Sequence, residues 1–342
     1  MPRPKEKSAQ AQIVDAARKH FGQEVARVSA PGGENRSSFR LHLAERTVIA
    51  TLRPNFRRTH LEAHVLTELG RHCSDLPQCL GVVGEIMFQS DVGKRRLNVE
   101  IAQVDGPAQL DLAAEAVAGI FRIHGAARQT ELNEIMPHLG NNKDWVLNFV
   151  DAVDFLQGLG GISDQFDRIA AYERIDAPAR QFVKWDCRSG NAAIGRDGKL
   201  RWFDFEYAGL RHGAEDIAWL IGDEAWPLAP QDMVDVVIDA FDPTCGIALP
   251  DYLDYLSVYL TFHAVQRLKL ISKEAKKRGW LSKDRIRRYD DAGVHPEFAA
   301  QICRVGAYFS DQSELTAPLT PNFLEAQQGF ETIAAQDAKR SA

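Results

Sequence analysis

The sequence predicts an α+β protein of two lobes: a small antiparallel sheet with one inserted helix, then a larger helical part containing a hairpin. The first third has short strand-like runs around an amphipathic helix, and the remainder has long helical patterns that one strand-rich stretch interrupts. Strands in one part and helices in another are typical of α+β proteins. We place the division near residue 90, with an N-terminal lobe over 1–90 and a C-terminal lobe over 91–342.

The elements of the N-terminal lobe are predicted from the spacing of apolar residues. Val65, Leu66 and Leu69 share one face of a helix, and Pro54 ends the strand before it. The expected elements are a helix over 12–21, strands over 37–43 and 46–52, a helix over 57–71, and strands over 81–84 and 85–89.

Helical patterns dominate the C-terminal lobe, with one hairpin between them. The run Arg196-Asp-Gly-Lys separates two apolar runs, and Asp-Gly in that setting is a strong hairpin signal. Helices or helical apolar faces are expected over 112–121, 145–153, 215–221, 231–241 and 251–277.

Composition limits the classes of function. The 342 residues are 45% hydrophobic and 26% charged, which is ordinary for a globular protein, and the net charge of -6 argues against a nucleic-acid binder. The five cysteines form no C-x-x-C pair, so neither a disulfide framework nor a zinc site is expected. Residues 1–10 read as a short disordered tail without a signal peptide's apolar centre, and no apolar run is long enough to span a bilayer. We therefore expect a cytoplasmic protein without a membrane or nucleic-acid partner.

Three oxygen-bearing side chains around the hairpin point to chemistry. Asp186 and Asn191 are separated by four residues, the hairpin follows, and its second strand leads to Asp204. A hairpin brings its two ends together, so all three side chains should face one space. Magnesium prefers such hard oxygen ligands and leaves coordination sites for phosphate, and a carboxylate near an attacking hydroxyl can accept its proton.

This pattern resembles the aminoglycoside phosphotransferase-type kinases, a family that also includes choline-kinase-like and related small-molecule kinases. Their loop of Asp, four residues and Asn, a hairpin, and an apolar-Asp-aromatic-Glu segment match Asp186 to Asn191 and Phe203-Asp204-Phe-Glu206. The resemblance implies a bilobal protein-kinase-like fold that uses ATP or GTP with Mg²⁺. It implies Asp186 as the catalytic base and Asn191 and Asp204 as metal ligands.

The resemblance extends to the N-terminal lobe and implies nucleotide-binding residues there. The run from Gly32 and Gly33 is similar to the family's nucleotide-covering hairpin, and the helix over 57–71 is similar to its αC helix, which makes Glu62 the ion-pairing glutamate. The segment from Met87 resembles the hinge that contacts adenine. The implied hinge residues are Met87, Phe88 and Gln89.

Two positions depart from the family pattern. Lys184-Trp185 stands before Asp186 where the family has His-Gly or His-Arg, and the histidine usually supports the loop. The strand over 47–52 has no lysine to contact the α and β phosphates, and Arg53 is the nearest cation. Arginine is longer and planar where lysine is a compact point charge, so Arg53 is an imperfect substitute.

Other notable residues receive simpler interpretations. Asp216 should bind backbone near the catalytic loop, His124 should be a packed or capping histidine, and Cys187 should fill space. The basic stretch over 276–288 is expected to be a solvated face, with a site for an anionic substrate or partner as the alternative.

The predicted function is phosphorylation of a hydroxyl on a small molecule: an amino sugar, amino alcohol, sugar or nucleoside. The first alternative is a pseudokinase that binds nucleotide or a protein partner without turnover, which the missing lysine and histidine favour. The second is an unrelated α+β binding protein. A protein kinase is disfavoured, because no D-F-G follows the hairpin and no A-P-E element is present.

Overall fold

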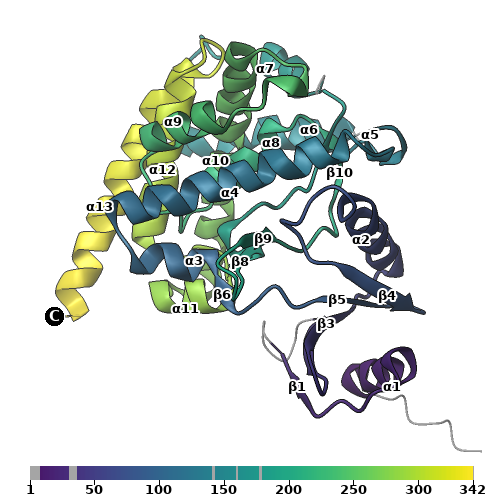
Figure 1. The fold of residues 1–342 in the computed structure, drawn as a ribbon. Helices are drawn as coiled ribbons and strands as arrows, with labels where there is room; N and C mark the ends of the chain where they lie inside the picture. The colour runs from purple at the N-terminus through teal and green to yellow at the C-terminus, as the bar shows by residue number, and fades with distance from the viewer. Residues whose placement is uncertain (1–7, 31–36, 141–142, 159–160, 177–178, 342) are drawn as a thin grey trace, which may run out of the picture.

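The structure is a computed structural model that describes residues 8–30, 37–140, 143–158, 161–176 and 179–341 (Figure 1). The elements of its first part are α1 (Ala9–Phe21), β1 (Arg27–Ser29), β2 (Ser38–His42), β3 (Thr47–Leu52), α2 (Phe56–Leu69), β4 (Cys79–Val83) and β5 (Ile86–Ser90). The second part contains β6 (Arg95–Arg96), α3 (Leu97–Glu100), η1 (Ile101–Gln103), α4 (Gly106–Ala127), α5 (Leu132–Ile135), α6 (Lys143–Val150), η2 (Asp151–Gly158), α7 (Arg168–Asp176), β7 (Gln181–Val183), η3 (Ser189–Asn191), β8 (Ala192–Ile194), β9 (Leu200–Trp202), β10 (Gly209–Arg211), α8 (Ala214–Ile221), α9 (Pro230–Ala240), η4 (Pro243–Cys245), α10 (Leu249–Arg278), α11 (Lys283–Tyr289), α12 (Pro296–Asp311), η5 (Ala317–Leu319) and α13 (Thr320–Ser341).

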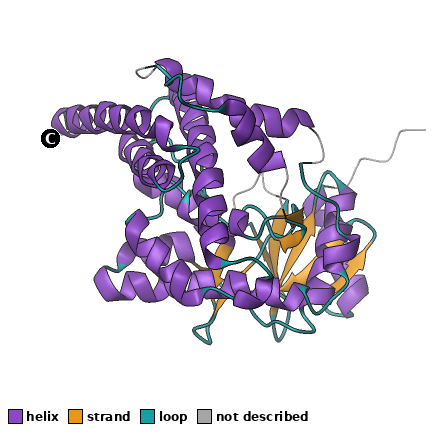
Figure 2. Ribbon diagram, turned by 90° about the horizontal axis from the view of Figure 1, so that it is seen from above, coloured by secondary structure: helices purple, strands orange, loops and turns teal. Residues whose placement is uncertain are grey.

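The first part is an antiparallel sheet in the order β1-β2-β3-β5-β4, with a helix on each face. Neighbouring side chains on a strand point to opposite faces. Met87 accordingly packs with the core that includes Leu66 of α2, whereas Phe88 packs with Ile13 of α1. Figure 2 shows the strands gathered on one side of the molecule and the helices filling the other.

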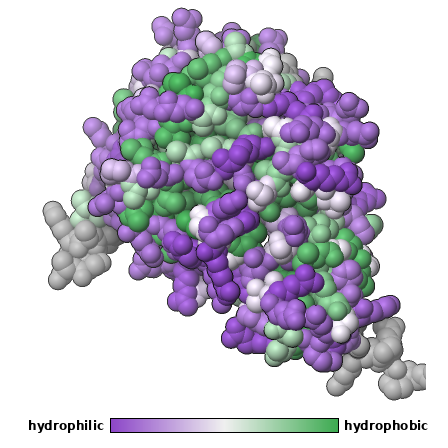
Figure 3. All heavy atoms as spheres, in the orientation of Figure 1, coloured by the Kyte–Doolittle hydropathy of each residue, from purple (hydrophilic) through white to green (hydrophobic). Residues whose placement is uncertain are grey.

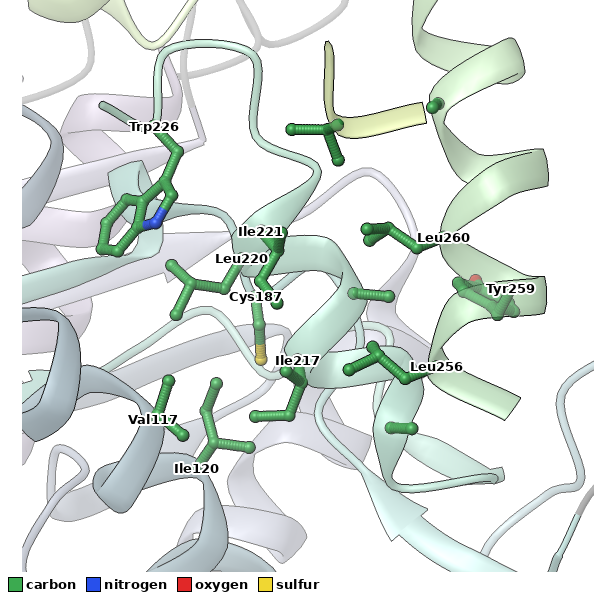
Figure 4. Close-up of a cluster of buried hydrophobic side chains, with 14 of the residues drawn as sticks. Val117, Ile120, Cys187, Ile217, Leu220, Ile221, Trp226, Leu256, Tyr259 and Leu260 are labelled. Atoms are coloured by element: carbon green, nitrogen blue, oxygen red, sulfur yellow. The ribbon is translucent and has the colours of Figure 1, made fainter. Parts of the chain in front are cut away.

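The second part is built around the long helices α4 and α10, with α8 packed between them. Figure 4 shows apolar side chains from these three helices in one buried cluster that also contains Cys187. Burial raises the pKa of the Cys187 thiol well above its ordinary value, which agrees with a space-filling role. The labelled members of this cluster are Val117, Ile120, Ile217, Leu220, Ile221, Trp226, Leu256, Tyr259 and Leu260.

A short three-stranded sheet, β6-β8-β9, carries the predicted hairpin. Ala192 pairs with Trp202 at the open end, and Gly198 takes a φ of 77° in the turn. Glycine is the residue that adopts this left-handed conformation without strain. The hairpin therefore forms where the Asp-Gly signal predicts it, and its open end faces the first sheet.

The predicted fold class is confirmed, and the differences lie at element ends. The helix expected over 57–71 spans Phe56–Leu69, and the helix expected over 251–277 spans Leu249–Arg278. Ala9 and Gln10, expected in a disordered tail, belong to α1, because the Ser8 hydroxyl accepts a hydrogen bond from Ala11 N at 3.3 Å and caps the helix. That part of the prediction is wrong.

The surface is largely hydrophilic on the face that Figure 3 shows, with smaller apolar areas between charged and polar side chains. Among the described residues, no helix is both long and apolar enough to cross a membrane.

We predict that acid destabilises the fold through two buried histidines. Burial lowers the pKa of His212 and of His263 to about 3, from an ordinary value of 6.5. The unfolded chain then binds protons that the folded chain excludes, so stability present above pH 6.5 is lost as the pH falls toward 3. In urea unfolding measured across this window, His263→Leu should reduce the pH slope by up to about 1.4 kcal/mol per pH unit. The exposed His60→Leu is the control, and an equal slope in wild type and His263→Leu would contradict the prediction.

Candidate active site

A pocket of about 450 Å³ lies between the first sheet and the hairpin. The sheet contributes one row of side chains, because Arg40 of β2, Ile49 of β3 and Gln89 of β5 are register partners across it. The opposite wall is formed by Ala193 and Phe203 at the hairpin. Other residues that line the pocket are Asp186, Asn191, Asp204, Arg53 and Glu62.

The structure brings the three predicted residues Asp186, Asn191 and Asp204 to this one pocket. The Asn191 side-chain nitrogen donates to the Asp186 carbonyl at 2.9 Å and to Asp186 Oδ2 at 3.0 Å. Phe203 N donates to the Asn191 carbonyl at 2.9 Å, which places Asp204 beside the same loop. The amide oxygen of Asn191 is left as the atom that can bind a cation.

The backbone of the site is strained. Among the described residues other than glycine, positive φ occurs at Trp185 (55°), Asp186 (50°), Asp204 (67°) and Asp290 (49°). Three of these four are aspartates that line the pocket. Residues other than glycine hold this conformation only where their surroundings impose it, and such strain concentrates at functional sites.

Asp216 holds the strained loop in place through the backbone amides of the loop. Its carboxylate accepts hydrogen bonds from Lys184 N at 2.8 Å and Trp185 N at 2.7 Å, and His124 Nε2 lies 2.8 Å from Oδ2. The prediction that Asp216 binds backbone near this loop is confirmed. His124 contacts the Asp216 carboxylate and packs beneath the loop.

Lys184 supports the loop at the position where the family has histidine. Its side chain is only 1% exposed, and Nζ donates to the carbonyls of Trp185 at 3.3 Å and Asp186 at 3.2 Å. Nζ also lies 5.4 Å from the centre of the Phe205 ring, where a cation is favourable. The sequence shows that the histidine is missing, but it does not show that Lys184 takes over its supporting role.

Arg53 occupies the centre of a carboxylate cluster. Its Nη2 lies 2.6 Å from Glu62 Oε2 and 2.7 Å from Asp204 Oδ1, and its Nη1 lies 2.7 Å from Glu206 Oε1. Burial alone would lower the pKa of Arg53, but the three carboxylates outweigh it and raise the pKa above its usual value. Arg53 is thus a fixed cation in the pocket, and it makes the pairing with Glu62 that the sequence predicted.

Glu62 connects the two lobes, because it contacts Arg53 in one and Phe205 in the other. The side chain is fully buried, and while one oxygen pairs with Arg53, Oε1 accepts a hydrogen bond from Phe205 N at 3.0 Å. That backbone amide directly follows Asp204. The contact therefore fixes the aspartate's position relative to α2.

Sequence reasoning missed Arg188 and Asp290. Arg188 Nε donates to Asp186 Oδ1 at 2.9 Å, and its Nη2 lies 3.4 Å from Asp290 Oδ2. A side chain at Gly190 would overlap Asp290, so this glycine permits the close approach. The only sequence signal was an arginine two residues after Asp186; Asp290 lies a hundred positions away with no local motif.

The oxygen donors fit a magnesium ion that shares its coordination with phosphate. Asn191 and Asp204 offer two hard oxygen ligands, and Asp204 is 30% exposed to the pocket. In the part of the chain that the structure describes, no cluster of three His, Cys, Asp or Glu side chains is arranged to hold a metal. Magnesium commonly takes one or two carboxylates and completes its shell with water and substrate phosphates, so this donor set suits it.

Comparisons with solved structures identify the fold. A choline/ethanolamine kinase family protein from Mesorhizobium loti aligns with a TM-score of 0.51 at 14% identity, covering 89% of this chain and 93% of that one. Aminoglycoside 2'-phosphotransferase-IIIa in its GDP complex gives 0.51 at 13% identity, over 84% and 99%. Spectinomycin phosphotransferase with ADP and spectinomycin gives 0.50 at 10% identity, over 92% and 98%. The fold is that of the small-molecule kinases. No protein-family model matches the sequence, and no curated protein matches it.

Within this kinase-like fold, only some of the residues expected to bind nucleotide line the pocket. Gln89 lines the pocket, whereas Met87 and Phe88 are fully buried, and both lie in the middle of β5 between β3 and β4. Residues 91–94, which directly follow β5, also line the pocket. Gly32 and Gly33 lie outside the described residues.

Proposed function

We propose that the protein is a phosphotransferase that uses ATP or GTP with Mg²⁺ to phosphorylate a hydroxyl of a small molecule. The observation that carries the proposal is the convergence of Asp186, Asn191 and Asp204 on one pocket of a kinase-like fold. Phosphoryl transfer needs positioning and charge stabilisation more than covalent chemistry, and this pocket supplies the groups for both.

Asp186 is the proposed base. Its carboxylate reaches into the pocket from a loop that Asp216 and Lys184 hold by four hydrogen bonds to backbone groups. Asn191 and Arg188 each bind one of its two oxygens, which fixes the orientation of the carboxylate. A base held in this way can orient an acceptor hydroxyl and accept its proton as the oxygen attacks.

Asn191 and Asp204 are the proposed metal ligands. The bound Mg²⁺ would offset the charge of the phosphates. Asp204 shares one oxygen with Arg53 and retains the other for a cation.

The nucleotide base is proposed to lie between the lobes. Ile49 of β3 faces the pocket from one side, and Ala193 and Phe203 face it from the other, so that a flat ring fits between apolar walls. Residues 90–94 also line the pocket. Gln89 is the one member of the expected hinge that lines it.

Arg53 is the proposed substitute for the missing lysine. It extends from the end of β3 and is anchored by Glu62, which is the arrangement usual for the lysine. Its planar head can bind a phosphate through two donors at once. Those donors now bind carboxylates, so a nucleotide must share Arg53 with Asp204 and Glu206.

That sharing of Arg53 supports one alternative, a pseudokinase that binds nucleotide or a protein partner without turnover. Turnover of ATP in the presence of an acceptor separates the enzyme from the pseudokinase.

We further propose a cytoplasmic location without nucleic-acid or membrane partners, supported by five cysteines that remain free thiols and by the net charge of -6.

The first functional prediction concerns Asp186→Asn. The change removes the proton acceptor while keeping the shape of the side chain, so kcat should fall by ~10²-fold or more. The affinity for nucleotide, measured by calorimetry, should change little. Near-normal turnover would show that another group accepts the proton.

The second functional prediction concerns the metal ligands. Asp204→Ala should abolish magnesium-dependent nucleotide binding and Asn191→Ala should weaken it, because each change removes an oxygen ligand. Calorimetric titration of nucleotide with and without Mg²⁺ measures this. Asp197→Ala, in the exposed turn of the same hairpin, is the control. Unchanged affinity in both site variants would rule these residues out as ligands.

The third functional prediction concerns Arg53 and Glu62. Arg53→Ala and Glu62→Gln should each raise the KM for ATP, by about 10-fold for a charge-assisted contact. The double variant should be less than additive, because the two side chains act as a pair. Glu62→Gln can still accept the bond from Phe205 N, which limits damage to the fold. Arg57→Ala, on the exposed side of α2, is the control. ATP kinetics unaffected by Arg53→Ala would exclude the proposed role.

A further inference from the structure

The described carboxylates that line the pocket are all engaged by arginines, with three arginines serving six carboxylates. Arg53 pairs with Glu62, Asp204 and Glu206; Arg40 pairs with Asp91; Arg188 pairs with Asp186 and Asp290.

The pairs made by Arg40 and Arg53 are held firmly. Arg40 binds Asp91 through two bonds of 2.6 and 2.9 Å and is 6% exposed, and Arg53 is 9% exposed. Displacing a buried guanidinium from its partner leaves a charge without compensation, at a cost of several kcal/mol. An acceptor that carries ammonium groups would therefore have to compete with an arginine at each of these carboxylates.

Positive charge, by contrast, remains available at the pocket. Lys94 and Arg288 both line it, and neither makes an ion pair within the described ranges. Lys94 ends the segment 90–94 that lines the pocket. Arg288 comes from α11, two residues before the Asp290 that contacts Arg188 and thereby reaches the proposed base.

The end of α11 is fixed next to the catalytic loop. The Asn98 side chain donates to the Arg287 carbonyl at 2.9 Å, and Arg278 binds Asp291 through two bonds of 2.8 Å. Gly190 of the catalytic loop allows Asp290 to approach closely. The charge of Arg288 is thus presented from an anchored helix at the acceptor side of Asp186.

From these observations we propose that the acceptor is an alcohol that bears an anionic group, a phosphate or a carboxylate, and that Arg288 binds this group. The inference rests on the proposed function and narrows its substrate class. In the reaction, Asp186 takes the proton of the acceptor hydroxyl, a bond forms from that oxygen to the γ-phosphorus, and the bond to the nucleoside diphosphate breaks. The anionic group stays unchanged and orients the hydroxyl toward Asp186.

Two matched sets of acceptors test the proposal at saturating Mg²⁺ and ATP. One set is glucose, glucosamine and glucose 6-phosphate; the other is glycerol, 2-amino-1,3-propanediol and glycerol 3-phosphate. Transfer of radiolabelled phosphate should give the highest kcat/KM for the phosphate ester in at least one set and the lowest for the amine in both. Preference for an amine, or no dependence on acceptor charge including no transfer to any acceptor, overturns the proposal.

Variants of α11 assign the effect to Arg288. Arg288→Ala should lower kcat/KM for the phosphate ester by about 10-fold or more, the value of a hydrogen bond between charged groups, while leaving the KM for ATP unchanged. Arg288→Glu should reverse the order of the ester and the amine. Arg285→Ala, exposed on the same helix and outside the pocket, is the matched control. An Arg288→Ala variant with wild-type preference overturns the assignment.

Magnesium-dependent nucleotide binding, measured on the same samples, distinguishes a failure of the anionic-acceptor proposal from a failure of the proposed phosphotransferase function. If it is intact and amines are preferred, only the anionic acceptor is wrong. If it is absent from the wild-type protein, the proposed function itself fails.

Discussion

The site depends on one buried carboxylate, that of Glu62. It lies in α2, pairs with Arg53 at the end of β3, and accepts the backbone amide that follows Asp204. A buried glutamate needs such partners, because an uncompensated charge in the interior is costly. The contacts that compensate the charge of Glu62 therefore also fix the distance between the lobes. Both walls of the pocket are positioned by these contacts.

The strain of the loop around Asp186 and the support of that loop form a second constraint. Asp186 and Trp185 adopt a conformation that free chains avoid, and Asp216 and Lys184 together bind the backbone groups that this conformation exposes. Because Asp216 and Lys184 are both buried, the loop that carries Asp186 is held rigidly. This accounts for a loop that departs from the family pattern yet still brings Asp186, Asn191 and Asp204 together.

Local patterns predicted most of the fold and the heart of the site. The spacing of Asp186, Asn191 and the Asp-Gly turn is local, so their meeting follows from hairpin geometry. Arg188, Asp290 and the role of Lys184 could not be predicted, because they depend on which distant segment packs against the loop. The burial of Met87 and Phe88 could not be predicted for a related reason: the register of β5 between its neighbours is a tertiary property.

The absence of a side chain at Gly190 has a mechanical consequence. Because the end of α11 rests directly on the loop that carries Asp186, the two cannot move apart or together without disturbing Asp290 and its contact with Arg188. A molecule held against α11 is thus located by the same rigid unit that holds Asp186. Under the proposed function, the position of an acceptor hydroxyl relative to Asp186 would then depend little on closure of the lobes.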